Sequence, residues 1–319
     1  MLPTVSSLEL ERILETGHGT DIDDPVLLVE GRLPAGLRPR IGLFPHVLVG
    51  TDPDPLLDAV VDDEALAAIA ERAVTRPRTL IATALLLRGV EGRDVTQSLV
   101  AESTAYSLLQ SGEEFRAWRE SRPRSTTPPH DAGDAIVARR DGGHLDIEFN
   151  RPERRNAYSG EMRGRLAEVL NVALVDDTVT SVTLRGRGTN FSSGGDLDEF
   201  GSFTDPVRAN ESRLASSVAW SLHTLRRRLG PNLVCRVHGA NFGAGVELAS
   251  FCGRVVAHID TTFCLPEVDL GLVPGAGGTA GLPARVGRQR TALMAFTAMR
   301  VDARTAYEWG LVDEITTTS

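Results

Sequence analysis

The stretch that decides the fold runs from His238 to Leu282 and reads HGANFGAGVELASFCGRVVAHIDTTFCLPEVDLGLVPGAGGTAGL. Within it, a glycine-rich turn leads into a helix, and two glutamates, Glu247 and Glu267, stand among apolar residues. The spacing between the glutamates is enough for a helix, a short strand and a return to the same pocket. Apolar surroundings raise the pKa of a carboxyl group, which can then give or take a proton near neutral pH. The stretch therefore predicts an acid–base site.

Backbone N–H groups are the second chemical feature of this region. At the start of a helix they can hold a developing oxyanion, and Gly243–Ala244–Gly245 is such a start. FSSGGDL, at 191–197, is another glycine turn between a strand and a helix. It is either a plain turn followed by an aspartate cap or the source of a second donor, the N–H of Gly195, facing that of Ala244. Two such donors on one carbonyl oxygen would form an oxyanion hole.

Neither glycine-rich segment matches a nucleotide-binding motif. The turn at 243–245 lacks the third glycine and the distal acid of a dinucleotide fingerprint. VPGAGGTAG, at 273–281, lacks the GK[ST] of a P-loop. An NTPase is therefore rejected.

Composition narrows the class of protein. The 319 residues contain 41% hydrophobic and 24% charged residues, as in an ordinary globular protein, and carry a formal charge of −9. That charge argues against nucleic acid as a main partner, although a local basic cluster can still bind an anionic cofactor. The N-terminus does not resemble a signal peptide, and no apolar run reaches the roughly 18 residues of a membrane span. We expect a cytoplasmic protein with no membrane partner. Three cysteines lie in apolar runs without metal-ligand spacing and are expected to be buried free thiols: Cys235, Cys252 and Cys264.

The chain divides into three segments. A proline-, serine- and threonine-rich stretch, 122–134, is expected to be a linker between an N-terminal region, 1–121, and a core, 135–319. In the core, strand and helix patterns alternate, which predicts an α/β fold with a mainly parallel sheet and covering helices. Strands are predicted at 144–149, 181–186 and 233–238, and helices at 160–175, 206–228 and 244–252, with Ser159 as an N-cap.

The N-terminal region has a different pattern. Short β segments are predicted within residues 26–50, at LLVEG, RIGLF and HVLVG. Amphipathic helices follow, and their apolar faces must pack on another part of the molecule. These helices are expected at 63–75, 77–88, 96–111 and 113–121.

Five motifs, in this order, resemble those of the crotonase (enoyl-CoA hydratase/isomerase) superfamily. They are NRPERRNA, FSSGGDL, HGANFGAGVELA, LPEVDLGLVPGAGG and AYEWGLVDEI, and they cover about residues 135–316. The resemblance implies a spiral of ββα units, acyl-CoA thioester substrates, and a homotrimer or dimer of trimers. Coenzyme A would be part of the substrate, with no permanently bound cofactor and no metal.

The resemblance also assigns roles to residues. The N–H groups of Gly195 and Ala244 would bind the thioester oxygen, and Glu247 and Glu267 would move protons, as in an enoyl-CoA hydratase. Arg154 and Arg155 are either a solvated basic corner or contacts for the coenzyme A phosphates. The residues expected to bind coenzyme A are Arg154, Arg155, Ala157, Ser193 and Gly195.

The ends of the chain depart from the family pattern. Members usually continue beyond the GLVDEI segment with several helices that cover the active site. Here such helices resemble the segments at 63–89 and 98–121, the second of which has the pattern ExxAYxLLxSxxEF. We therefore expect a circular permutation that places the helical cap region at the N-terminus, the alternative being an unrelated helical extension.

Several functions are compatible with these motifs. The first expectation is a hydratase that adds water across a 2-enoyl-CoA. A double-bond isomerase would use one glutamate to shuttle a proton, and a thioester hydrolase is a further option. A non-catalytic acyl-CoA-binding assembly subunit would keep the fold without the chemistry, although such a protein has no physical need to bury two carboxyl groups.

Overall fold

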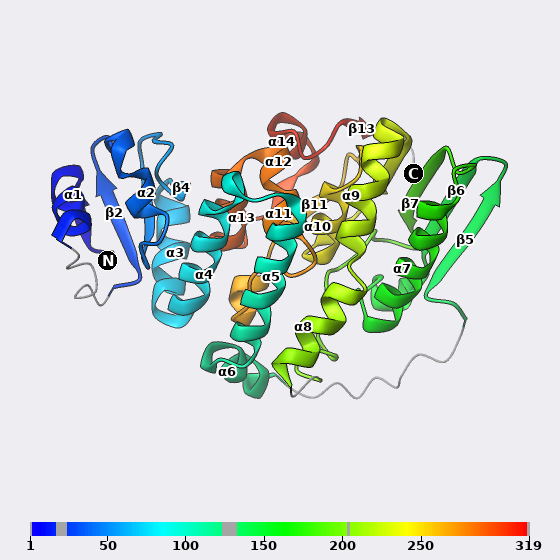
Figure 1. Cartoon of the computed structure of the whole chain (residues 1–319), viewed down its shortest axis with the longest axis horizontal. Coiled ribbons are helices and arrows are strands. Elements are labelled where there is room, and N and C mark those ends of the chain that lie inside the picture. Colours follow the sequence, from blue (N-terminus) through cyan, green and yellow to red (C-terminus); the bar gives the residue numbers. More distant parts are fainter. Residues whose placement is uncertain (1, 17–23, 123–132, 203–204, 318–319) are drawn as a thin grey trace.

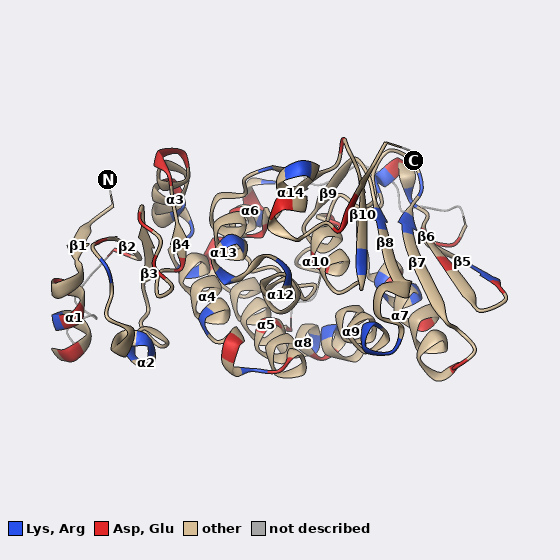
Figure 2. Cartoon of the chain, turned by 90° about the horizontal axis from the view of Figure 1, so that it is seen from above, with Lys and Arg blue, Asp and Glu red and all other residues tan. Residues whose placement is uncertain are grey.

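The computed structural model describes residues 2–16, 24–122, 133–202 and 205–317. It has the mixed α/β architecture expected from the sequence, with an N-terminal sheet at one end, a group of helices in the middle and the larger sheet of the core at the other end (Figures 1 and 2). The two ends of the chain lie at opposite ends of the molecule. None of the helices in the described ranges has the length and apolar character of a membrane span.

The core is built on six strands in the order β13-β10-β8-β7-β6-β5. Only the β5–β6 pair is antiparallel, and the other neighbouring pairs are parallel. The strands are β5 (Ile136–Asp141), β6 (His144–Phe149), β7 (Ser181–Gly186), β8 (Leu233–Val237), β10 (Arg254–His258) and β13 (Glu314–Thr316). A second sheet of three strands has the order β12-β11-β9. Its strands are β9 (Ala240–Phe242), β11 (Thr262–Cys264) and β12 (Val301–Asp302).

Helices cover these sheets and bury their apolar sides. Helix α7 matches the predicted range, and the side chain of Ser159 caps it by accepting a hydrogen bond from the Met162 N–H. The core helices are α7 (Gly160–Val175), α8 (Pro206–Ala215), α9 (Val218–Leu229), α10 (Ala244–Ser250), α11 (Gly278–Gly281), α12 (Pro283–Val286), α13 (Arg288–Thr297) and α14 (Ala303–Trp309). The expected state of the cysteines is confirmed, because all three are buried free thiols.

The N-terminal region forms a parallel sheet followed by four helices. Its strands, in the order β1-β2-β3-β4, are β1 (Thr4–Ser6), β2 (Val26–Glu30), β3 (Val47–Gly50) and β4 (Ala59–Val60), accompanied by the helices α1 (Ser7–Thr16) and α2 (Arg38–Ile41). The helices after the sheet are α3 (Asp63–Thr75), α4 (Pro77–Arg88), α5 (Val95–Gln110) and α6 (Glu113–Ser121). They pack on the core rather than away from it: α3 and α4 contact α13, and α5 contacts α8 and α11.

Two predicted elements were wrong. The segment RIGLF, expected as a strand, begins in α2 and continues as a turn, and Pro39 near the start of that helix favours the helical conformation. The single helix expected over 206–228 is broken into α8 and α9, because Ser217 leaves the helical path and its hydroxyl caps α9 at the Trp220 N–H. Most of the predicted linker, 123–132, lies outside the described residues.

Candidate active site

Two glycine turns meet at the centre of the core. The Tyr158 N–H donates to the Gly194 carbonyl at 2.7 Å, and the Phe242 N–H donates to the Ser192 carbonyl at 3.0 Å. Gly243 has φ +46°, a conformation that side chains disfavour, and a Cβ added to it would lie 3.6 Å from Gly194 Cα. These contacts bring the turn before Gly195 next to the turn before α10.

The N–H groups that follow these turns are free. In the described part of the chain, neither the N–H of Gly195 nor that of Ala244 donates a hydrogen bond within the protein. Ala244 is the first residue of α10, where an N–H has no acceptor in its own helix. Both residues line a cavity of about 180 Å³. Both N–H groups therefore lie at the wall of one cavity without an acceptor among the described residues, and their role as an oxyanion hole stays a prediction.

Glu247 reaches the cavity from α10 and is 2% exposed. The N–H groups of Ala276 and Gly278 both donate to its Oε2, each at 2.7 Å. Burial raises the pKa of Glu247 to about 7, even though these backbone donors lower it. Near neutral pH the carboxylate and the carboxylic acid are therefore both populated, which is what a general base requires.

Glu267 lines the same cavity. It is 8% exposed, and its Oε2 has no hydrogen-bond partner in the described structure. Its Oε1 lies against Gly243, since a Cβ added to Gly243 would be 2.3 Å from this oxygen. Burial, and then the charge of Glu247, raise the pKa of Glu267 well above its usual value. Burial therefore favours the protonated form of Glu267.

A third carboxyl group, Glu102, comes from α5 in the N-terminal region. The Gly277 N–H donates to its Oε1 at 2.7 Å, and the Thr279 N–H donates to its Oε2 at 2.8 Å. The Thr279 hydroxyl donates to the same Oε2 at 2.7 Å. Burial, and then the charge of Glu247, raise the pKa of Glu102 to about 8, and the Thr279 and Gly277 donors oppose this change.

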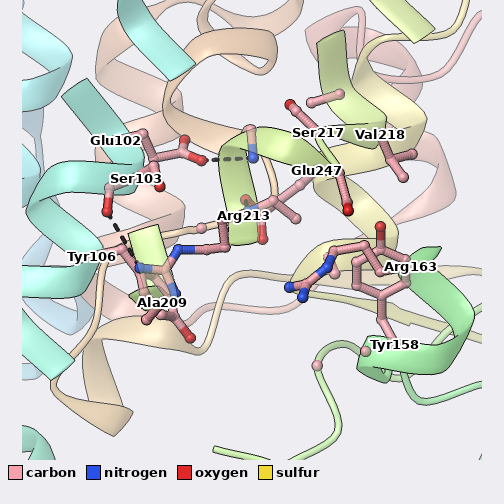
Figure 3. A pocket seen from close by; sticks show the side chains of 18 of the residues that line it. Glu102, Ser103, Tyr106, Tyr158, Arg163, Ala209, Arg213, Ser217, Val218 and Glu247 are labelled. Atoms are coloured by element: carbon pink, nitrogen blue, oxygen red, sulfur yellow. Dashed lines mark hydrogen bonds between the residues drawn. The ribbon is translucent and has the colours of Figure 1, made fainter. Parts of the chain in front are cut away.

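The remaining wall of the cavity carries tyrosines and arginines. The Arg213 guanidinium lies 4.5 Å from the centre of the Tyr106 ring, and Arg163 points into the cavity beside Tyr158 (Figure 3). Burial raises the pKa of both tyrosines. The Tyr106 ring also packs tightly on the loop at 275–279, since a Cβ added to Gly275 would lie 2.3 Å from the Tyr106 Cδ2. Helix α5 is thus part of the site itself.

The residues expected to bind coenzyme A lie elsewhere, apart from Gly195. Arg154 forms ion pairs with Asp196 at 3.0 Å and with Asp198 at 2.8 Å, which engages its guanidinium within the protein. Arg155 is exposed. None of the residues Arg154, Arg155, Ala157 and Ser193 lines the cavity. Their role in binding coenzyme A stays a prediction.

Sequence reasoning did not identify four of the cavity residues: Glu102, Tyr106, Arg163 and Arg213. A signal existed for the first two, because an acid and an aromatic residue four positions apart share one face of a helix. In the described ranges, no group of His, Cys, Asp and Glu side chains has the arrangement of a metal site.

Comparison with known proteins finds relatives of the core. A family model described as enoyl-CoA hydratase/isomerase matches residues 139–319. The 1,2-epoxyphenylacetyl-CoA isomerase of Escherichia coli is 34% identical over 183 residues, which are 56% of this chain and 69% of that protein. The 2,3-dehydroadipyl-CoA hydratase of the same organism is 31% identical over 180 residues, 56% of this chain and 68% of that protein. A crystal structure from Thermobifida fusca in complex with acetoacetyl-CoA has a TM-score of 0.51 and 28% identity, covering 57% of this chain and 73% of that one.

Proposed function

Because the chain belongs to the enoyl-CoA hydratase/isomerase family, an enzyme family whose crotonase fold the sequence predicted, we propose that it is a hydratase that adds water across the double bond of a 2-enoyl-CoA. The single observation that supports hydration best is the pair of buried carboxyl groups. Glu247 has a pKa of about 7 and receives two backbone N–H groups, whereas burial raises the pKa of Glu267, which has an oxygen without a partner in the described structure. One is suited to accept a proton and the other to donate one.

The proposed reaction begins with water held between the two glutamates. Glu247 accepts a proton from the water as its oxygen attacks Cβ, and the π electrons of the double bond move toward the thioester. The resulting negative charge on the thioester oxygen is held by the N–H groups of Gly195 and Ala244, with the positive end of the α10 dipole behind them. Glu267 then donates its proton to Cα, so one water molecule has been added, and a proton passing from Glu247 to Glu267 restores the starting state.

The test measures the disappearance of enoyl absorbance with crotonyl-CoA and trans-2-hexenoyl-CoA. Glu247→Gln and Glu267→Gln should each lower kcat/KM by about 10²–10⁴-fold, the usual effect of removing a general acid or base. Chromatography of the product separates the alternatives. A 3-hydroxyacyl-CoA supports hydration, a shifted double bond indicates an isomerase, and free coenzyme A indicates a thioester hydrolase. Binding of both esters without any turnover would instead identify an acyl-CoA-binding subunit.

We also propose that α3 to α6 serve as the helical cap of the active site, in the place of the C-terminal helices of relatives, through circular permutation. Glu102 and Tyr106, which contact the loop beside Glu247, support this role. Residues 135–319 expressed alone should then be inactive, and co-expression with residues 1–121 should restore turnover. An unrelated extension would leave the core active by itself. The proposed assembly is a homotrimer or dimer of trimers, which light scattering of the purified protein tests. The proposed location is the cytoplasm.

A further inference from the structure

Two arginines from neighbouring helices line the catalytic cavity and form no ion pair with any of the described residues. Arg163 lies on α7 and Arg213 on α8, and both line the cavity (Figure 3). Arg213 donates to the Ser107 hydroxyl and to the Ser103 carbonyl, and Arg163 donates to the Ser212 hydroxyl at 3.3 Å. The Nε atoms of both arginines are buried and lack an acceptor in the described structure. Both guanidinium groups are therefore under-satisfied.

Two other arginines with buried side chains form ion pairs within the described residues. Arg88 pairs with Asp58, and Arg285 pairs with Asp313 at 3.0 Å. In the described ranges, no carboxylate forms such an ion pair with Arg163 or Arg213. Glu199, the carboxyl group of the wall near Arg163, instead accepts the Gly160 N–H at 2.6 Å. Removing a cation from water without an anion is costly, and an uncompensated buried arginine is a common anion-binding group.

The electrostatics of the pair favour an anion between them. Burial lowers the pKa of Arg213, and the positive charge of Arg163 lowers it further, against the opposing influence of Tyr106 and Glu102. A bound carboxylate would offset the cost of removing the guanidinium groups from water, and it would also offset their mutual repulsion. The planar guanidinium fork also matches a carboxylate in a bidentate geometry.

We propose that Arg163 and Arg213 form a subsite for a carboxylate at the far end of the acyl chain, so that the preferred substrates are CoA thioesters of unsaturated dicarboxylic acids. This inference rests on the proposed function, because it assumes that the thioester lies at Gly195 and Ala244. Both arginines line the same cavity as Glu247. Arg163 and Glu247 also both lie close enough to Tyr158 for their charges to shift its pKa, Arg163 downward and Glu247 upward. An acyl chain lying across the cavity would therefore place its far end at the arginines. A phosphate of coenzyme A has the same anionic chemistry, and the experiment distinguishes the two sources.

Calorimetric titration with three ligands tests the subsite: free coenzyme A, hexanoyl-CoA and the mono-CoA thioester of hexanedioic acid. The saturated esters bind without reacting. A carboxylate held by charged hydrogen bonds should make the diacid ester bind about 10- to 150-fold more tightly than hexanoyl-CoA in the wild type. Arg163→Met and Arg213→Met should abolish this preference and leave the affinity for hexanoyl-CoA and coenzyme A unchanged, whereas Arg213→Lys should keep part of it. Arg208→Met, an exposed arginine of α8 outside the cavity, is the matched control and should behave as the wild type.

Two results would overturn the proposal. The first is equal affinity of the wild type for the two esters. The second is an equal weakening of all three ligands in both arginine variants, which would assign the arginines to the coenzyme A phosphates. If Arg213→Met fails to fold because it loses its contacts with α5, Arg163→Met carries the test alone. Absence of binding by every ligand would instead refute the proposed function, and a tight diacid ester whose 2-enoyl form is not hydrated would refute hydration but not the subsite.

Discussion

The carboxyl groups of Glu102 and Glu247 accept hydrogen bonds from alternate backbone N–H groups of the loop at 275–279. Ala276 and Gly278 donate to Glu247, while Gly277 and Thr279 donate to Glu102. The loop is thereby fixed from both sides, by a helix of the core and by a helix of the N-terminal region. The two carboxyl groups also ionise in sequence, because the charge on Glu247 helps to raise the pKa of Glu102 above that of Glu247.

The raised pKa of Glu102 makes the stability of the protein depend on pH. A carboxyl group whose pKa is higher in the folded than in the unfolded protein contributes stability below its unfolded value, and this contribution is lost as the pH rises through the folded value. For Glu102 the folded value is about 8 against an ordinary value of 4.5. Urea unfolding measures the free energy of unfolding at pH 6 and at pH 9. The fall between these two pH values should be smaller in Glu102→Gln than in the wild type, by about 2–3 kcal/mol.

Glu114→Gln is the matched control for this prediction. Glu114 also accepts backbone N–H groups, from Arg78 at 2.7 Å and from Thr79 at 3.1 Å, but it lies outside the cavity. Its substitution should lower the free energy of unfolding while keeping the pH dependence of the wild type. If Glu102→Gln and the wild type lose the same free energy between pH 6 and 9, Glu102 does not have the raised pKa described above.

The pH dependence of kcat/KM should be bell-shaped. Glu247 must be ionised to accept a proton, so the rate should rise with pH through about 7. Glu267 must be protonated to donate, so the rate should fall once the pH exceeds its raised pKa. Initial rates with trans-2-hexenoyl-CoA from pH 5.5 to 10 measure both limbs. A rate that stays constant between pH 6 and 8 would contradict the role of Glu247 as the base.

Gly243→Ala should disable the site with little change in the rest of the fold. The added methyl group would lie 2.3 Å from Glu267 Oε1, and it stands next to the donor Ala244. Loss of one oxyanion-hole donor alone lowers kcat by about 10²–10³-fold. Gly142→Ala is the control, since Gly142 also has a positive φ (+54°) but open space around it. Equal activity of the two variants would show that the contact with Glu267 is unimportant.

Asp58→Asn should destabilise the junction between the N-terminal sheet and the core. The Asp58 side chain is 1% exposed and forms ion pairs with Arg88 from α4 and Arg288 from α13. Removing its charge leaves two buried arginines unpaired, which should lower the free energy of unfolding by about 3–5 kcal/mol. Urea unfolding measures this effect. Glu91→Gln, which breaks a surface pair with Arg38, should cost less than about 1 kcal/mol, and a similar loss in both variants would contradict the argument.

Local patterns predicted much of the fold. Helices α3, α4, α6 and α7 and strands β6 and β7 begin and end at the predicted residues, because their apolar patterns and the turn residues that flank them are local in the sequence. Gly195, Ala244, Glu247 and Glu267 belong to motifs of short range and line one cavity, and their catalytic roles stay a prediction.

Features that depend on distant residues could not be predicted this way. Glu102 bonds to Thr279, and its helical pattern alone does not distinguish a buried acid with partners from a solvent-exposed one. The sequence predicts Arg154 either in a solvated basic corner or at a phosphate of coenzyme A, and its ion pair with Asp196, which comes from another glycine turn, is not apparent from the local sequence. The break between α8 and α9 likewise depends on Ser217, whose cap competes with a continuous helix.

The contact between Glu102 and the loop at 275–279 also sets when the enzyme becomes competent during its synthesis. Glu102 leaves the ribosome early, and its partners Gly277 and Thr279 are added much later. Until they arrive, Glu102 lacks the backbone donors that it has in the complete fold. The walls of the cavity contributed by α5 and by the loop at 275–279 can therefore meet only after that loop has been synthesised.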